Sequence, residues 1–286
     1  MTSRTIFHAR HALKLPLAYK HDFTRSWFPS TSQAHRQVTT VVDSTSPFSF
    51  PFPFQQQPPK RPVNLVSFTS AEGKRLFRGA MDQGHAESFF KLLGNFSAQS
   101  SPMLGGVSSL AMALNALEID PKRIWKGNWR WFSGEQMKTC SSKEALYQNG
   151  IPFDEFTCLA QTHCDVEARR ASAMGYQEFV QALEDVTSNP NSQMVVNYSR
   201  TKLGQRGHSH FSPIGGHNTA EGMTLIMDVA RVEYPSVWVD THTLYEAMME
   251  TEHSGQSRGY FILRPGKAQQ FLKCRDCSRQ CNRRRA

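Results

Sequence analysis

Two residues in the second half of the chain have the types that acyl-transfer chemistry needs. His210 lies in the string H-S-H-F-S-P-I-G-G (208–216), and Asp228 follows 18 residues later in M-T-L-I-M-D-V-A (223–230). If these strings are neighbouring strands of a hairpin, the carboxylate can accept a hydrogen bond from Nδ1 of the imidazole. Such a bond fixes the tautomer and stabilises the imidazolium. On the residues alone, a purely structural His–Asp pair is the common alternative.

A His–Asp pair of this kind also needs a nucleophile. The best place for one is the N-terminus of a helix, where the helix dipole lowers the pKa of a thiol. The clearest helix start in the chain is S-P-M-L-G-G-V-S-S-L, residues 101–110. This segment contains no cysteine, so the residues that could act as base and orienting carboxylate have no evident thiol to activate.

The elements that must position these residues follow from hydrophobic spacing. Helical spacing of apolar residues predicts helices over 85–95, 107–118, 141–149, 175–186 and 241–252. Alternating and β-branched runs predict strands over 193–199, 208–214, 223–230, 237–239 and 259–264. A helical first half followed by a mainly β second half indicates an α+β fold with an antiparallel sheet. Gly215 and Gly216 are expected to form a turn, and His217 and His242 to lie at the surface.

The net charge of +9 lies at the two ends of the chain. Counting Lys and Arg against Asp and Glu gives +6 for residues 1–62, −4 for 63–263 and +7 for 264–286. A nucleic-acid-binding fold carries its basic charge on the folded face, so nucleic acid is not an expected partner. No apolar run approaches the roughly 20 residues that a membrane-spanning helix needs. A membrane channel or transporter is therefore excluded.

The expected domains are a leader (1–62), a folded domain (63–265) and a basic, Cys-containing tail (266–286). The first 21 residues of the leader hold four basic residues and no acidic one, and residues 46–62 are rich in Pro and Phe. The leader is therefore either an organelle transit peptide or a disordered extension. Import into a mitochondrion or plastid stays open beside a cytoplasmic location.

The tail contains a second cysteine pattern, with Cys274, Cys277 and Cys281 at C-x-x-C-x-x-x-C spacing. Three thiolates can hold a soft ion such as Cd(II), Zn(II) or Cu(I), and the neighbouring Arg residues favour thiolate formation. No fourth ligand is evident, so a disordered basic tail with incidental thiols is an equal alternative. No nucleotide or organic cofactor is expected, because no Lys-Ser/Thr follows Gly215 and Gly216 at phosphate-loop spacing.

Four strings in the folded domain resemble the phytochelatin synthase family, the glutathione γ-glutamylcysteinyltransferases of papain-like fold. They are S-F-F-K-L-L-G-N-F-S-A-Q-S-S-P (88–102), S-L-A-M-A-L-N-A-L-E-I-D-P-K-R-I-W-K-G-N-W-R-W-F (109–132), G-H-S-H-F-S-P-I-G-G-H-N (207–218) and M-D-V-A-R-V-E-Y-P-S-V-W-V (227–239). The resemblance covers about residues 85–265 and thins between 150 and 200. It implies a helical lobe joined to an antiparallel β lobe.

The resemblance also assigns roles to single residues. The family's catalytic Cys stands in P-x-[YF]-C-G-x-x-S-L, which here reads P-M-L-G-G-V-S-S-L (102–110), so Gly105 takes the nucleophile's position. His210 takes the place of the general base and Asp228 that of the orienting carboxylate. Gln99 matches the oxyanion-hole glutamine, and Arg231 matches an arginine near the substrate.

The implied activity is the transfer of γ-Glu-Cys between glutathione molecules in heavy-metal detoxification. Glycine cannot form the acyl-enzyme, so we expect this activity to be severely impaired. The alternative is a catalytically dead protein that binds glutathione or its metal thiolate, or that has a regulatory role. The possible protein partners are a second copy of the chain, in a homo-oligomer, or an active paralogue. The expected metal is Cd, Zn or Cu, carried as the glutathione thiolate or bound to the tail, where the family often has Cys-rich segments.

Overall fold

The computed structural model describes residues 63–266, apart from residues 123, 125, 126, 128, 129, 138 and 140 and the side chain of Lys143. The predictions for the leader and for the three tail cysteines therefore lie outside the described residues. In the part of the chain that is described, no helix is both long and apolar enough to cross a membrane.

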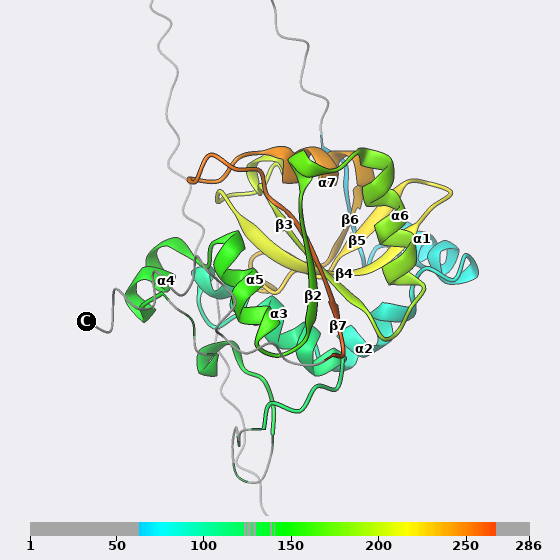
Figure 1. Ribbon diagram of the computed structural model, residues 1–286. Helices are drawn as coiled ribbons and strands as arrows, with labels where there is room; N and C mark the ends of the chain where they lie inside the picture. Colours follow the sequence, from blue (N-terminus) through cyan, green and yellow to red (C-terminus); the bar gives the residue numbers. More distant parts are fainter. Residues whose placement is uncertain are drawn as a thin grey trace, which may run out of the picture. The chain divides into compact units, whose positions relative to one another are not determined.

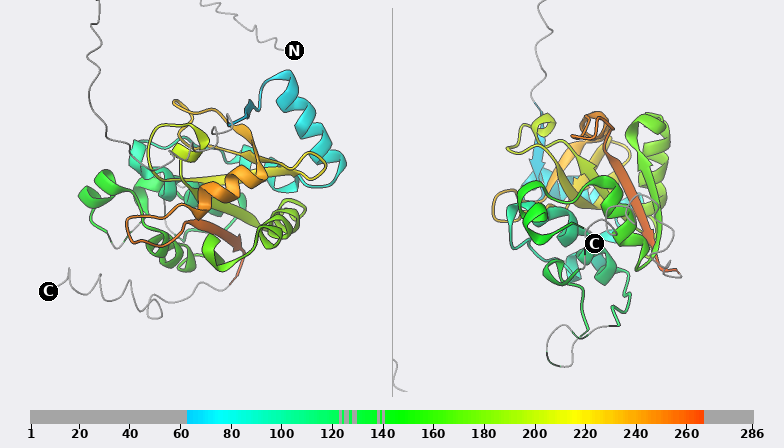
Figure 2. Two further views of the ribbon diagram at one scale, coloured as in Figure 1. Left: turned by 90° about the horizontal axis from the view of Figure 1, so that it is seen from above. Right: turned by 60° about the vertical axis from the view of Figure 1, so that its left-hand side comes forward.

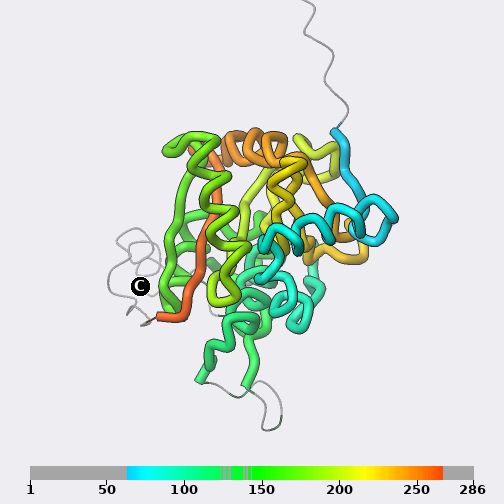
Figure 3. Tube along the Cα trace, turned by 90° about the vertical axis from the view of Figure 1, so that its right-hand side faces the viewer, coloured from blue at the N-terminus to red at the C-terminus, as the bar shows by residue number. Residues whose placement is uncertain are grey.

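The centre of the folded domain is one seven-stranded sheet in which every pair of neighbouring strands is antiparallel. The strand order is β1-β6-β5-β4-β3-β7-β2, so the last strand lies between the second and the third (Figure 1). Figure 3 shows β7, in red, running beside β2, in green. The bounds are β1 Leu65–Ser67, β2 Asp165–Arg170, β3 Gln193–Tyr198, β4 His210–Asn218, β5 Met223–Ile226, β6 Val237–Asp240 and β7 Gly259–Arg264.

The helices precede most of the strands in the chain, as the spacing of apolar residues predicts. Their bounds are α1 Ala71–Asp82, α2 Glu87–Gly94, α3 Gly105–Ala116, α4 Lys143–Asn149, α5 Phe153–Gln161, α6 Tyr176–Thr187 and α7 Thr241–Met249. A short 3-10 turn, Pro102–Leu104, leads into α3. The helices and the antiparallel sheet form the α+β fold that the sequence predicts.

The sheet is covered on both faces. Apolar residues of α3 and α5 pack with Val195, Phe211 and Phe261 of the central strands, whereas α6 and α7 pack with Val196, Ile214 and others on the opposite face. Two further views show α3 and α5 on one side of the sheet and α7 on the other (Figure 2). A third core joins α1 and α2 to the β5–β6 end of the sheet.

Helix α3 is buried along its whole length, from Gly105 to Ala116. Its Gly, Ala and Ser residues are small enough to let the helix axis approach the sheet closely. Ser109 Oγ donates a hydrogen bond to the carbonyl oxygen of Phe211 on β4, at 2.9 Å. The start of α3 is thereby tied to the strand that carries His210.

The structure corrects two local expectations. Gly215 and Gly216 lie inside β4 at a bulge, where the pairing with β5 shifts register, and not in a turn. A Cβ on Gly215 would lie 2.8 Å from Met227 Sδ, so the Met227 side chain would have to move to admit a larger residue. His217 is buried, with 2% of its surface exposed, because its strand continues under α1 and α2. His242 is exposed as expected.

Candidate functional site

The hairpin of β4 and β5 brings His210 and Asp228 together. His210 is the first residue of β4, and Asp228 follows the end of β5 by two residues. Because the two strands are antiparallel, the start of β4 and the end of β5 lie at the same end of the hairpin. Nε2 of His210 lies 2.8 Å from Oδ1 of Asp228, and both side chains are buried.

The ring is turned the opposite way from the sequence-based expectation. Asp228 contacts Nε2, and not Nδ1. Since Asp228 can only accept, Nε2 carries the hydrogen and the uncharged ring holds its lone pair on Nδ1. That atom lies 2.8 Å from the point where a Cβ on Gly105 would stand. The base nitrogen therefore faces the start of α3, as a base for a nucleophile at residue 105 should.

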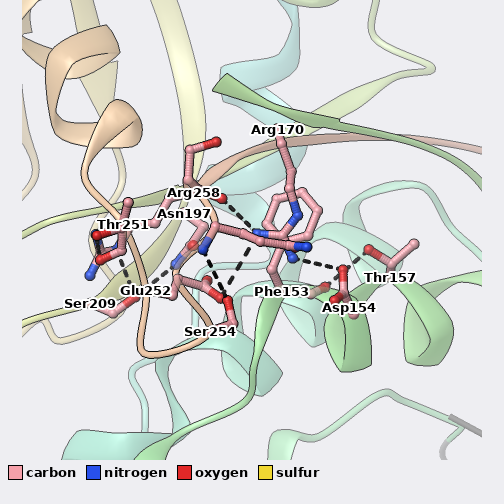
Figure 4. Close-up of polar contacts among 12 residues, drawn as sticks. Phe153, Asp154, Thr157, Arg170, Asn197, Ser209, Thr251, Glu252, Ser254 and Arg258 are labelled. Carbon is pink, nitrogen blue, oxygen red and sulfur yellow. Dashed lines mark hydrogen bonds and ion pairs between the residues drawn. The ribbon is translucent and has the colours of Figure 1, made fainter. Parts of the chain in front are cut away.

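Two buried polar side chains, Asn197 and Arg258, hold the backbone that leads into His210. Figure 4 shows both of them beside Ser209. Asn197 Nδ2 donates to the carbonyl oxygen of His210 and to Ser209 Oγ, at 3.2 and 2.9 Å. The guanidinium of Arg258 donates to Ser209 Oγ, to the carbonyl oxygen of His208 and to two carbonyl oxygens of residues 250 and 251. These contacts fix the position from which the imidazole projects.

A third buried residue, Arg200, completes the polar group and was not predicted from the sequence. Its Nη1 and Nη2 donate to Oδ2 and Oδ1 of Asp228, at 2.8 and 3.1 Å. The Ala230 N–H donates to Oδ1 at 2.8 Å, and the Tyr198 hydroxyl lies 3.5 Å from Oδ2. Asp228 is thus surrounded by donors on both oxygens. Asp228 lies 28 residues beyond Arg200 in the sequence, so no local pattern could have revealed this role.

These contacts set the charges of the group. Burial alone would raise the pKa of Asp228, but the hydrogen bonds and charges of His210 and Arg200 outweigh it and lower the pKa to about 2. Burial lowers the pKa of His210, and the opposite effect of Asp228 does not compensate for it. Asp228 is therefore ionised and His210 uncharged near neutral pH.

Gly105 is the first residue of α3, with helical dihedral angles of −53° and −46°. An ideal Cβ at this position would lie 2.5 Å from His210 Cε1, 2.8 Å from His210 Nδ1 and 3.0 Å from Gln99 Oε1. Carbon atoms in van der Waals contact stand roughly 3.5–4.0 Å apart. The imidazole thus occupies space that the first side-chain atom of any other residue would need.

Gln99 lies beside Gly105, but its amide is turned away from the orientation that an oxyanion hole needs. Nε2 donates to the carbonyl oxygen of Pro102 at 3.1 Å, so the oxygen and not the N–H group faces Gly105. Oε1 is buried and has no hydrogen-bond partner among the described residues. A role in stabilising an oxyanion stays a prediction that requires the amide to rotate.

The structure does not bring Arg231 into this group. It lies in the turn after Asp228 and is exposed, and its side chain makes no hydrogen bond or ion pair with other described residues. Its predicted place near the substrate stays a prediction.

The cysteines of the described part of the chain are poor nucleophiles. Cys164 is completely buried, its thiol lies 3.4 Å from the carbonyl oxygen of Ala160, and burial raises its pKa to about 12. Cys158 is buried and disulfide-bonded, so it has no free thiol. No cluster of three or more His, Cys, Asp or Glu side chains suited to a metal ion occurs among the described residues.

With this geometry established, comparisons with known proteins identify the family. A model of the phytochelatin synthase family matches residues 57–260. The chain belongs to the phytochelatin synthase family. It is 42% identical over 217 residues to glutathione gamma-glutamylcysteinyltransferase 1 of Arabidopsis thaliana, covering 74% of this chain and 44% of that relative. A glutathione gamma-glutamylcysteinyltransferase from Schizosaccharomyces pombe is 35% identical over 206 residues, covering 71% of this chain and 50% of the relative.

A wheat (Triticum aestivum) glutathione gamma-glutamylcysteinyltransferase 1 is 41% identical over 202 residues, covering 69% of this chain and 40% of the relative. The chain thus spans half or less of the length of these phytochelatin synthases. The matched part includes the region of Gly105, His210 and Asp228, as the family match to residues 57–260 requires.

Proposed function

We propose that this chain binds glutathione, alone or as a metal thiolate, and carries out little or no γ-Glu-Cys transfer. The observation that carries the proposal is the glycine at position 105. The point where a Cβ of residue 105 would stand lies 2.8 Å from Nδ1 of His210, the base nitrogen. The names of the relatives support glutathione as the ligand. The substrate and the loss of turnover are both proposals for this chain.

In the transfer reaction, a thiolate attacks the carbonyl carbon of the Cys–Gly peptide bond of glutathione. A thioester to γ-Glu-Cys forms and Gly leaves after it accepts a proton. The amine of a second glutathione then attacks the thioester, forms a peptide bond and releases the thiolate. Glycine offers no atom for the first attack, so the two-step route is closed at residue 105.

The serines near Gly105 are poorly placed to replace the missing thiol. Ser109 Oγ is buried and already donates to the carbonyl oxygen of Phe211. Ser108 lies in the same buried helix, and neither has a thiol's acidity. Cys164 is buried and stays protonated. A displaced nucleophile would also lose the alignment that attack requires, since small misplacements cost large factors in rate.

The second candidate function is a slow transferase, favoured by the intact His210–Asp228 pair at 2.8 Å. Removal of one triad member in other acyl-transfer enzymes leaves a residual acceleration of roughly 10³–10⁴ over water. Incubation of the purified chain with glutathione and Cd(II), followed by chromatography of the thiol peptides, separates the two. We expect no phytochelatin above the level made by the His210→Gln variant; formation that depends on His210 would favour the slow transferase.

Binding is tested separately by calorimetry with glutathione and with its Cd(II) complex. We expect saturable binding of one of these ligands without release of free Gly. An absence of binding would contradict the proposal and leave a chain that has lost both binding and catalysis. If binding is found, mixing the chain with an active family member tests the regulatory role, which predicts a change in that enzyme's rate.

A role in heavy-metal detoxification would follow from binding of the metal thiolate. The metal would be cargo carried by glutathione, or it would be held by Cys274, Cys277 and Cys281. Substitution of these three cysteines by Ser distinguishes the two routes, because only binding through the tail is lost.

A further inference from the structure

The third charged residue of the buried group at His210 and Asp228 is Arg200, which lies between β3 and β4. The side chains of Arg200 and Asp228 are 6% and 2% exposed, so their ion pair is almost entirely removed from water. Both terminal nitrogens of the guanidinium contact the carboxylate, one on each oxygen. Two-point contact fixes the plane of Asp228 as well as its charge.

Arg200 is itself held in place from two other sides. Nη1 also donates to Gln205 Oε1 at 2.6 Å, and Cζ lies 4.5 Å from the ring centre of Tyr234. The carbonyl oxygen of Arg200 accepts hydrogen bonds from the N–H groups of Leu203 and Gln205. Since the guanidinium is stacked, paired and buried, it has little freedom to leave Asp228.

Within the described part of the chain, few other charged or titratable groups lie around His210. Tyr198 lies on the neighbouring strand, with its ring 6.0 Å from the imidazole, and burial raises its pKa so that it stays a neutral hydroxyl. Glu233, in the turn that follows Asp228, acts on His210 at longer range. Arg200 and Asp228 are therefore the two close charges, and they cancel.

We propose that Arg200 is a positioning residue for His210: by neutralising Asp228, it keeps the imidazole uncharged with its Nδ1 lone pair toward Gly105. Without Arg200, the buried carboxylate would have only the imidazole to balance its charge. A proton would then move onto Nδ1, and the ring would change from a hydrogen-bond acceptor at Gly105 into a donor. The proposal concerns the same site as the proposed function, but it holds for the ligand-free chain and can fail independently of glutathione binding.

The test is a pH titration of the histidine ring nitrogens by NMR on the ligand-free full chain, with His210 assigned by the His210→Gln variant. In the native chain we expect Nε2 protonated and Nδ1 unprotonated at neutral pH. In Arg200→Gln we expect the pKa of His210 to rise by about one unit or more, because an unpaired neighbouring carboxylate favours the imidazolium. Arg200→Lys keeps the charge and should leave the pKa near the native value. Arg75→Gln, which removes an exposed ion-paired guanidinium, is the control.

A purely structural role for Arg200 would change stability without moving the pKa, so an unchanged pKa in a folded Arg200→Gln variant contradicts the proposal. If that variant does not fold, the double variant Arg200→Gln/Asp228→Asn decides, since it leaves no buried charge unpaired. We expect its His210 pKa to match the native value, because the pair is neutral as a unit. A shift of about one unit or more in the double variant would overturn the proposal.

Discussion

The imidazole of His210 occupies the space where a side chain at residue 105 would begin. A Cβ there would stand 2.5 Å from Cε1 of the ring, which no folded protein tolerates without movement. The site therefore differs from a site with Cys at position 105 by more than the absence of the cysteine side chain. The base has taken up part of the nucleophile's space while keeping its hydrogen bond to Asp228.

This relationship predicts that Gly105→Ala is destabilising. The new methyl group must displace the ring of His210 or the amide of Gln99, and overpacking of a buried site costs about 1–3 kcal/mol. Gly94→Ala is the matched control, because a Cβ at Gly94, also helical, meets no atom within 4 Å. Urea unfolding of both variants checks the prediction. Equal stability of the two variants would show that the ring yields freely.

We expect Gly105→Cys to restore acylation in part. The thiol would stand at the start of α3 beside Nδ1 of His210, but the ring must shift to admit Cβ. Mass spectrometry of the intact variant after incubation with glutathione should show a γ-Glu-Cys adduct. In the double variant Gly105→Cys/His210→Gln we expect the adduct to form about 10²–10⁴-fold more slowly. Equal rates would mean that His210 does not serve as the base.

The buried imidazole of His217 predicts a loss of stability in acid. Burial lowers its pKa to about 4, below the ordinary value of about 6.5 for the unfolded chain. The unfolded chain therefore binds the proton more readily, so this contribution is intact above about pH 6.5 and decreases as the pH falls toward 4. The shift corresponds to about 3 kcal/mol in total.

The measurement is urea unfolding of the native chain and of His217→Gln between pH 7 and pH 4.5. We expect the free energy of unfolding to fall less steeply with pH in the variant. His242→Gln, which replaces an exposed histidine, is the control variant. If the free energy of unfolding of His217→Gln falls with pH as steeply as that of the native chain, other groups cause the acid sensitivity.

The contacts of Arg258 predict that its replacement destabilises the chain at the start of β4. Its guanidinium donates to the carbonyl oxygens of His208, Glu250 and Thr251, and replacement by Met leaves these acceptors without their partner. We expect Arg258→Met to lower the free energy of unfolding by about 2–4 kcal/mol. Arg264→Met, which removes an exposed contact to Glu167, should cost less than about 0.5 kcal/mol. Thermal or urea unfolding measures both losses. Equal losses of stability in Arg258→Met and Arg264→Met would contradict the structural role of Arg258.

The sequence was informative where the signal was local. The apolar spacing of residues 107–118 predicts α3, and β4 and β5, the hairpin strands that bring His210 and Asp228 together, follow from their apolar runs. Two helices, α1 and α5, and two strands were missed. Strand β2 reads D-V-E-A-R-R and lies at an edge of the sheet, so it needs little apolar surface and gives little sequence signal.

The details of the site depend on contacts between distant segments, which spacing alone does not reveal. The sequence predicts that His210 and Asp228 meet, but not which ring nitrogen the carboxylate contacts. Arg200 follows a strand by two residues and looks like any loop arginine, and only the tertiary fold pairs it with Asp228. The orientation of Gln99 likewise depends on a bond to Pro102 within a non-repetitive turn.

The most direct test of the central claim is the mass of the intact native chain after incubation with glutathione and Cd(II) and rapid acid quenching. We expect the unmodified mass at every time, with the Gly105→Cys variant as the positive control for trapping. A γ-Glu-Cys thioester or ester on any residue of the native chain would show that another nucleophile serves the His210–Asp228 pair, and would contradict the account.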